Sequence, residues 1–159
     1  HCAIDTIIQK YGEINGWINC VGGFSMGSLI EDAHDWELMY SINFITCLNG
    51  CRAILPQLKK QNYGCIINFG SKAALDGFPT AAPYLISKSA VHSLTKLISI
   101  EMNDSQARCN AILPGIIDTP ANRTAMPDED YSTWETTDQI GSKINNILTD
   151  SISGELVTL

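Results

Sequence analysis

The segment between residues 65 and 88 constrains the fold of this chain more than any other part of its sequence. A short apolar run, residues 65–69, ends at Gly70, and a segment with helical periodicity follows, introduced by Pro83. An apolar run of this length bounded by glycine predicts a buried strand, and proline is favoured in the first turn of a helix. We therefore expect the carboxyl end of a strand to face the first turn of a helix. In an open α/β sheet, ligands bind at that edge.

The rest of the sequence alternates between the same two patterns. Helix signals occur at residues 2–11, 35–61, 83–102 and 140–150, and runs that predict buried or final strands occur at residues 14–20, 65–69, 108–113 and 155–159. A polar, proline-containing stretch at residues 120–137 predicts a loop with some helix. Helices that alternate with strands favour a doubly wound parallel sheet, covered on both faces. A length of 159 residues is that of a single α/β domain.

Tyr84 and Lys88 lie four residues apart on the predicted helix, so their side chains are one turn from each other. A free tyrosine has a pKa of about 10, and a neighbouring ammonium favours the phenolate and lowers that pKa. Together they can form a general acid/base. The same spacing also describes an ordinary solvated pair on a helix surface. Two further polar residues favour the catalytic interpretation: Ser71, thirteen positions before Tyr84, and Asn43, twenty-eight before Ser71.

These four positions resemble the active site of the short-chain dehydrogenase/reductase family, an Asn-Ser-Tyr-Lys tetrad that ends in Tyr-x-x-x-Lys. Asn43, Ser71, Tyr84 and Lys88 match it in residue type, order and spacing. The run Asn-Cys-Val-Gly at 19–22 stands where the family has Asn-Asn-Ala-Gly. The run Pro-Gly-Ile-Ile-Asp-Thr at 114–119 is similar to the family segment that meets the nicotinamide. Each mark alone is weak, but together, in this order and spacing, they indicate the family.

The resemblance implies a Rossmann-type, NAD(P)-dependent oxidoreductase that transfers hydride between the nicotinamide and a carbonyl or alcohol carbon. Tyr84 would protonate the carbonyl oxygen in reduction, or take the alcohol proton in oxidation. Lys88 would lower the pKa of Tyr84 and bind the nicotinamide ribose. Ser71 would hold the substrate oxygen, and Asn43 would anchor a water in the proton relay. The other cofactor contacts that the resemblance implies are Asn19 and Gly22 on the adenosine side, and Pro114, Gly115, Ile117 and Thr119 at the carboxamide.

Two of these cofactor positions have an equally good structural explanation. The pair Gly22-Gly23 is explained equally well by a simple turn and by a cofactor contact, because glycine suits both unusual backbone angles and close approach. Thr119 can cap a helix that begins at Pro120, since threonine and proline are common at helix starts. The resemblance implies that the loop from Pro120 onward is the substrate lid.

The family's glycine-rich phosphate loop, between its first strand and first helix, has no counterpart in this sequence. That loop places backbone N–H groups and a helix N-terminus against the dinucleotide pyrophosphate. At about 30 residues per βαβ unit, the first strands with their helices would amount to roughly 60–70 residues. We therefore expect residues 1–159 to correspond to the C-terminal two-thirds of the family fold, and the sequence, which starts at His1, to be a fragment. The residue that selects NAD or NADP would lie upstream.

Two alternative functions stay open. Residues 72–77, 118–123 and 126–127 resemble quinonoid dihydropteridine reductase, a divergent family member that keeps the Tyr/Lys pair but lacks the serine. The presence of Ser71 favours an ordinary carbonyl or alcohol substrate. The second alternative is a non-catalytic subunit that keeps only an oligomer surface. The resemblance implies a homodimer or homotetramer packed through the helices that carry Asn43 and Tyr84, with apolar stripes at residues 47–58 and 90–98.

Composition narrows the remaining function classes. The net charge of −7 argues against nucleic acid, which is held by clustered Lys and Arg. No apolar run approaches the roughly 20 residues that span a bilayer, so no membrane partner is expected. The cysteines show no spacing of the zinc type, so no metal site is expected, and they indicate a reducing, cytoplasmic setting. Cys47 and Cys51 could form a redox pair, but we favour an apolar stripe shared with Leu48, Ile54, Leu55 and Leu58.

Overall fold

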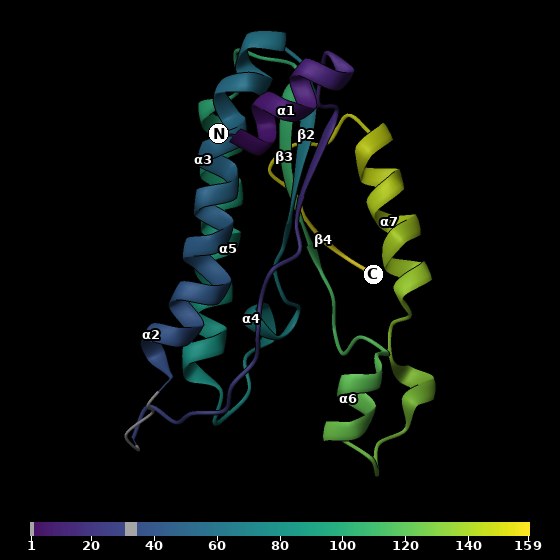
Figure 1. Cartoon of the computed structure of the whole chain (residues 1–159). Helices are drawn as coiled ribbons and strands as arrows, with labels where there is room; N and C mark the ends of the chain where they lie inside the picture. The colour runs from purple at the N-terminus through teal and green to yellow at the C-terminus, as the bar shows by residue number, and fades with distance from the viewer. Residues whose placement is uncertain (1, 31–34) are drawn as a thin grey trace.

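Four parallel strands form one sheet in a computed structural model that describes residues 2–30 and 35–159. They lie in the order β1 (Gly16–Asn19), β2 (Gly64–Phe69), β3 (Ala107–Leu113) and β4 (Leu156–Thr158). Each neighbouring pair is parallel, so all four carboxyl ends point toward the same edge of the sheet, the lower one in Figure 1. The predicted parallel α/β fold is confirmed.

Helices cover both faces of the sheet, as the alternation of patterns predicts. The helices α1 (Cys2–Tyr11), α3 (Thr46–Gln61) and α5 (Ala82–Glu101) lie on one side, and α7 (Thr137–Thr149) lies on the other (Figure 1). The side chains of successive β2 residues point alternately to the two faces of the sheet. Ile66 packs into the cluster formed with α3 and α5, whereas Cys65 and Ile67 pack into the cluster formed with α7.

Local sequence signals account for most helix boundaries. Gly12, at φ +85°, ends α1 in a left-handed conformation that glycine adopts without strain. Pro83 stands in the first turn of α5, where no intrahelical N–H bond is lost. Thr136 and Gln139 form a reciprocal capping box at the start of α7. The remaining elements are short: α2 (Trp36–Met39), a π-helix (Tyr40–Ile45), α4 (Ala73–Asp76), α6 (Pro120–Ala125) and a 3₁₀ turn (Tyr131–Thr133).

One prediction about burial is wrong. The strand predicted to be buried at residues 14–20 is only half-buried, with Ile18 at 38% exposure, because β1 forms one edge of the described sheet. The apolar stripe at residues 90–98 is divided between core and surface: Val91 and Ile98 are buried, whereas Leu97 is 56% exposed. The buried face of α5 is partly polar and consists of Pro83, Ser87, Lys88, Val91, His92, Thr95 and Ile98.

The other predicted stripe, on α3, is an internal surface of the chain. Cys47, Cys51, Ile54 and Leu58 are buried in the core beside Ile66. Both thiols are free, as an apolar stripe predicts. Because this face packs against the sheet, it cannot also be the oligomer surface for which it was considered. The continuous helical run Trp36–Gln61 is long and apolar enough, by length and composition alone, to cross a membrane. One such helix is only weak evidence for a membrane span, because helices that contribute to a protein core have the same length and composition.

Candidate active site

The four residues of the predicted tetrad meet at the carboxyl edge of the sheet. Asn43 comes from the π-helix, Ser71 follows β2, and Tyr84 and Lys88 lie in the first two turns of α5. The π-helix and α5 pack against each other, and α4 and α6 flank the same end of the sheet (Figure 1). The strand-to-helix junction predicted from residues 65–88 therefore forms the centre of the site.

Asn43 is only 1% exposed, and hydrogen bonds hold both ends of its amide. Its Oδ1 accepts from the Gly23 N–H at 2.8 Å, and its Nδ2 donates to the Gly23 carbonyl at 3.0 Å and to Ser87 Oγ at 3.0 Å. The residue thus joins the loop after β1 to α5. It sits in the one π-helical turn of the described chain, a distortion that is frequent at functional sites.

Lys88 is buried, at 6% exposure, and its Nζ donates to the Phe69 carbonyl at 2.8 Å. Burial lowers the pKa of Lys88 to about 8, an effect that the nearby Cys47 thiol partly offsets. A Cβ on Gly22 would stand 3.1 Å from this Nζ and 2.8 Å from Asn43 Oδ1. Gly22 is therefore required by close approach of the loop to two tetrad side chains, and is more than a turn residue. Its cofactor contact stays a prediction.

Tyr84 and Ser71 face each other across the junction. Burial raises the pKa of Tyr84 above its ordinary value, and a hydrogen bond with the Ser71 side chain partly offsets that rise. The expectation that Lys88 lowers the pKa of Tyr84 is not met in this structure, because the ammonium is directed to the Phe69 carbonyl and desolvation of the phenol dominates. Tyr84 is therefore a protonated hydrogen-bond donor near neutral pH.

His92 belongs to the site and was missed by the sequence analysis. Its Nε2 accepts from the Ser71 backbone N–H at 3.2 Å, and the side chain is 6% exposed. Burial, with Lys88 and Lys96 nearby, lowers the pKa of His92 to about 4, so the ring is neutral and can accept. A Cβ on Gly70 would lie 2.5 Å from His92 Nε2, which explains the glycine there. The sequence feature that could have identified His92 is the four-residue spacing from Tyr84 to Lys88, which continues to His92 and places all three on one helix face.

The Asn19 side chain lies in a buried network between the sheet and the helices. Its Nδ2 donates to Asn68 Oδ1 at 2.8 Å, and its Oδ1 accepts from Trp17 Nε1 at 2.9 Å. Asn68 in turn donates to Thr95 Oγ1 at 3.0 Å. The amide thus fixes the end of β1 from which the loop to Gly22 departs. The predicted adenosine contact of Asn19 stays a prediction.

The segment 114–119 leaves β3 beside the tetrad and leads into α6. Pro114 is buried, Gly115 is exposed and donates its N–H to Glu135 Oε2 at 2.9 Å, and Ile117 is half-buried. Thr119 Oγ1 accepts from the Asn122 N–H at 3.2 Å, which confirms that Thr119 caps α6. The nicotinamide contacts predicted for this segment remain predictions.

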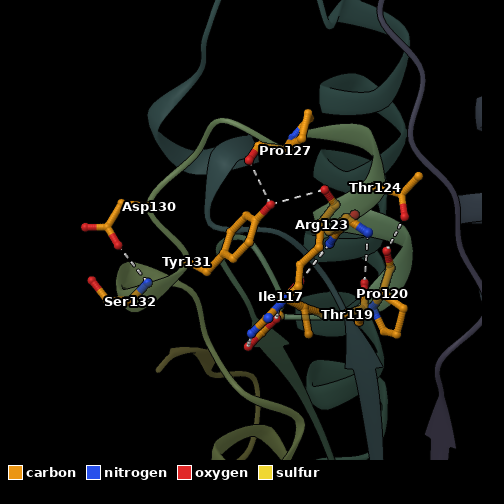
Figure 2. A network of polar contacts seen from close by, with 11 residues as sticks. Ile117, Thr119, Pro120, Arg123, Thr124, Pro127, Asp130, Tyr131 and Ser132 are labelled. Carbon is orange, nitrogen blue, oxygen red and sulfur yellow. Dashed lines mark hydrogen bonds and ion pairs between the residues drawn. The ribbon is translucent and has the colours of Figure 1, made fainter.

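The predicted lid, residues 120–137, is internally bonded (Figure 2). Arg123 donates to the Asp118 carboxylate at 2.6 and 2.8 Å, which lowers the pKa of Asp118, and lies 4.7 Å from the centre of the Tyr131 ring. The Tyr131 hydroxyl donates to the carbonyls of Arg123 (3.3 Å) and Pro127 (3.1 Å). The polar stretch therefore folds back on α6 rather than forming an unstructured loop. Within the described residues, no group of three His, Cys, Asp or Glu side chains could hold a metal.

Comparison with known proteins agrees with this geometry. A family model described as short chain dehydrogenase matches residues 1–130. The 2-(R)-hydroxypropyl-CoM dehydrogenase of Xanthobacter autotrophicus is 34% identical over 124 residues, which is 76% of this chain and 50% of that protein. Cyclopentanol dehydrogenase of Comamonas sp. is 31% identical over 125 residues, 78% of this chain and 50% of that protein. The chain thus spans about half the length of these relatives.

A solved structure described as ElxO with NADP bound has the same fold. It superposes with a TM-score of 0.86 at 25% sequence identity, over 98% of this chain and 69% of that chain. The likeness extends over all of the sheet and its flanking helices, so the four-stranded parallel arrangement is that of a Rossmann-type dinucleotide-binding fold.

Proposed function

Because the chain belongs to the short-chain dehydrogenase family, we propose that the natural polypeptide containing it is an NAD(P)-dependent oxidoreductase of carbonyl and alcohol substrates. The observation that carries this proposal is the convergence of Asn43, Ser71, Tyr84 and Lys88 at one edge of the sheet. They come from three separate segments, and a scaffold has no chemical reason to bring them together. The names of the relatives support this proposal, since cyclopentanol dehydrogenase is named for an alcohol.

The described residues fit a nicotinamide dinucleotide beside the tetrad. Gly22 and Gly115 leave bare backbone on the loops that flank Tyr84, and a side chain at Gly22 would displace Asn43 and Lys88. Lys88 would bind the nicotinamide ribose, and residues 114–119 would border the carboxamide. When bound, the reduced nicotinamide would supply a hydride to the carbonyl carbon, and the carbonyl oxygen would take up a proton from this chain; oxidation would be the reverse.

Tyr84 is the proposed donor of that proton. Because its pKa is raised, the phenol is protonated at neutral pH and can donate to the substrate oxygen, which Ser71 holds by a second hydrogen bond. His92 positions the backbone of Ser71, and Asn43 anchors the proton relay. In alcohol oxidation the same phenol acts in the reverse sense and must first be deprotonated to accept the alcohol proton.

The Tyr84→Phe variant of the natural polypeptide tests the role of the phenol. Because general acid catalysis contributes typically 10²–10⁴-fold, we expect kcat for ketone reduction with NADH or NADPH to fall at least about 100-fold. The dissociation constant of the cofactor, measured by nicotinamide fluorescence, should change less than about twofold, since the hydroxyl reacts with substrate. Tyr63→Phe is the matched control, because Tyr63 is 50% exposed next to the opposite end of β2.

Unchanged turnover in Tyr84→Phe would refute the assigned role. Quinonoid dihydropterin is the comparison substrate in the same assay. Reduction of dihydropterin that survives Ser71→Ala, while ketones are not reduced, would replace the proposed carbonyl chemistry with pteridine reduction.

A further inference from the structure

Two exposed phenylalanines stand beside Tyr84, and no role described so far accounts for them. Phe24 is 57% exposed and Phe78 is 40% exposed, yet their rings stack on each other with centroids 6.5 Å apart and 25° between the planes. Phe24 also meets the Tyr84 ring at 5.0 Å in an edge-to-face arrangement. Exposure of large apolar side chains to water is unfavourable, so the position of these two rings at the tetrad needs an explanation.

The two phenylalanines come from different loops that are tied together. Phe24 lies in the loop after β1, and Phe78 in the loop between α4 and α5. The Gly27 N–H donates to the Thr80 carbonyl at 2.7 Å, and the Ala82 N–H donates to the Gly27 carbonyl at 2.8 Å, which forms a parallel bridge between the loops. Asn43 also holds the first loop through both backbone groups of Gly23. The aromatic pair therefore has a fixed position relative to Tyr84.

Neither loop carries charge near the rings. Residues 20–30 and 77–84 contain no Asp, Glu, Lys, Arg or His. Further exposed apolar side chains border the same edge of the sheet, namely Val21, Met26, Leu75 and Ile116. The carboxylate of Asp35 approaches this region but accepts a hydrogen bond from Ser25. A substrate with a charged body would find no counter-charge in residues 20–30 or 77–84, whereas an apolar one would cover the exposed rings.

We propose that the substrate is a neutral ketone, or the corresponding alcohol, whose carbonyl is part of or adjacent to an apolar ring, and that this ring packs on Phe24 and Phe78. The carbonyl oxygen then reaches the Tyr84 hydroxyl at the edge of the aromatic pair. This inference rests on the proposed function and adds the substrate class. Aromatic faces favour rings over chains of equal carbon number, because flat surfaces make contact with less loss of conformational freedom.

The test compares three ketones with the natural polypeptide and NADH or NADPH: α-tetralone, the chain ketone of equal carbon number 2-decanone, and 2-oxobutanoate. We expect kcat/KM for α-tetralone to exceed that for 2-decanone at least about tenfold, with 2-oxobutanoate lowest. Phe24→Ala and Phe78→Ala should each lower kcat/KM for α-tetralone about 3- to 10-fold, mainly through KM, and change that for 2-decanone by a smaller factor. Tyr11→Ala, at a 65% exposed aromatic residue on α1, is the control and should change neither.

The outcomes separate this inference from the proposed function. Equal or faster reduction of 2-decanone or 2-oxobutanoate would overturn the substrate class while leaving the oxidoreductase function in place. A parallel loss for all ketones in Phe78→Ala, whose ring contacts Phe24, would show a support role for the pair and would also overturn it. If no ketone is reduced with either cofactor, the proposed function itself fails and the inference fails with it.

Discussion

Gly22 and its neighbour Gly23 provide a matched pair of substitutions that tests the packing of the tetrad. A Cβ on Gly22 would stand 2.8 Å from Asn43 Oδ1 and 3.1 Å from Lys88 Nζ, whereas a Cβ on Gly23 would meet only Ile42 and Met39 at 3.5 Å or more. Neither glycine has a positive φ, so alanine is compatible with the backbone at both positions. The two variants therefore differ in what the added methyl group displaces.

The expected cost of Gly22→Ala follows from how firmly its neighbours are held. Asn43 cannot retreat without losing its bonds to Gly23 and Ser87, and Lys88 cannot retreat without losing its bond to the Phe69 carbonyl. Overpacking of this kind costs about 1–3 kcal/mol of unfolding free energy. Gly23→Ala makes ordinary van der Waals contacts, so its cost should stay within about 0.5 kcal/mol.

Urea unfolding of the natural polypeptide measures the stability difference, and ketone turnover measures the consequence for the site. We expect Gly22→Ala to lower kcat at least about tenfold, because it moves two tetrad side chains by more than catalysis tolerates. Gly23→Ala should keep most of the activity. Equal stability and equal turnover of the two variants would refute the close approach of the loop to Asn43 and Lys88.

Two further predictions concern buried polar groups behind the tetrad. His92→Gln should make stability less dependent on pH in mild acid. The pKa of His92 is about 4 in the folded state, so as the pH falls below about 6.5 the imidazole is protonated in the unfolded state before it is protonated in the folded state. This difference lowers the unfolding free energy of the natural polypeptide by about 2 kcal/mol at pH 5. Urea midpoints at pH 7 and pH 5 measure this slope, and an unchanged slope in the variant contradicts the burial of a neutral ring. Asn68→Leu removes the amide that accepts from Asn19 Nδ2 and donates to Thr95 Oγ1, and should cost about 2–3 kcal/mol in the same assay, whereas a neutral effect would exclude the network.

The sequence predicted the parallel fold and the tetrad because both depend on short-range patterns and fixed spacings. Alternating apolar runs and helical periodicity placed the four strands, and capping residues such as Thr119 placed helix starts. The half-burial of β1 was not predictable, since periodicity does not distinguish an edge strand from a central one. The π-helix at Asn43 was also invisible, because its geometry depends on bonds to Gly23 and Ser87, distant in sequence.

The polar buried face of α5 shows a second limit. Apolar periodicity identifies a stripe at residues 90–98, but the buried positions of α5 also include Lys88, His92 and Thr95, whereas Leu97 is exposed. Each of these is buried because a partner at the end of β2 satisfies it, namely the Phe69 carbonyl, the Ser71 N–H and the Asn68 amide. A polar residue can be assigned to a core from sequence only when its partner is known, and these partners lie 19–27 positions away.

The most direct test of the account is the fate of a deuterium label. The natural polypeptide is incubated with a ketone and NAD(P)H that carries deuterium at the transferring position of the nicotinamide, and the alcohol is analysed by mass spectrometry. We expect one deuterium on the carbinol carbon, delivered from one face of the nicotinamide only, and labelled alcohol formed at least about 100-fold more slowly with Tyr84→Phe. Alcohol formed without deuterium, or labelled alcohol formed at the same rate by Tyr84→Phe, would contradict hydride transfer at this tetrad.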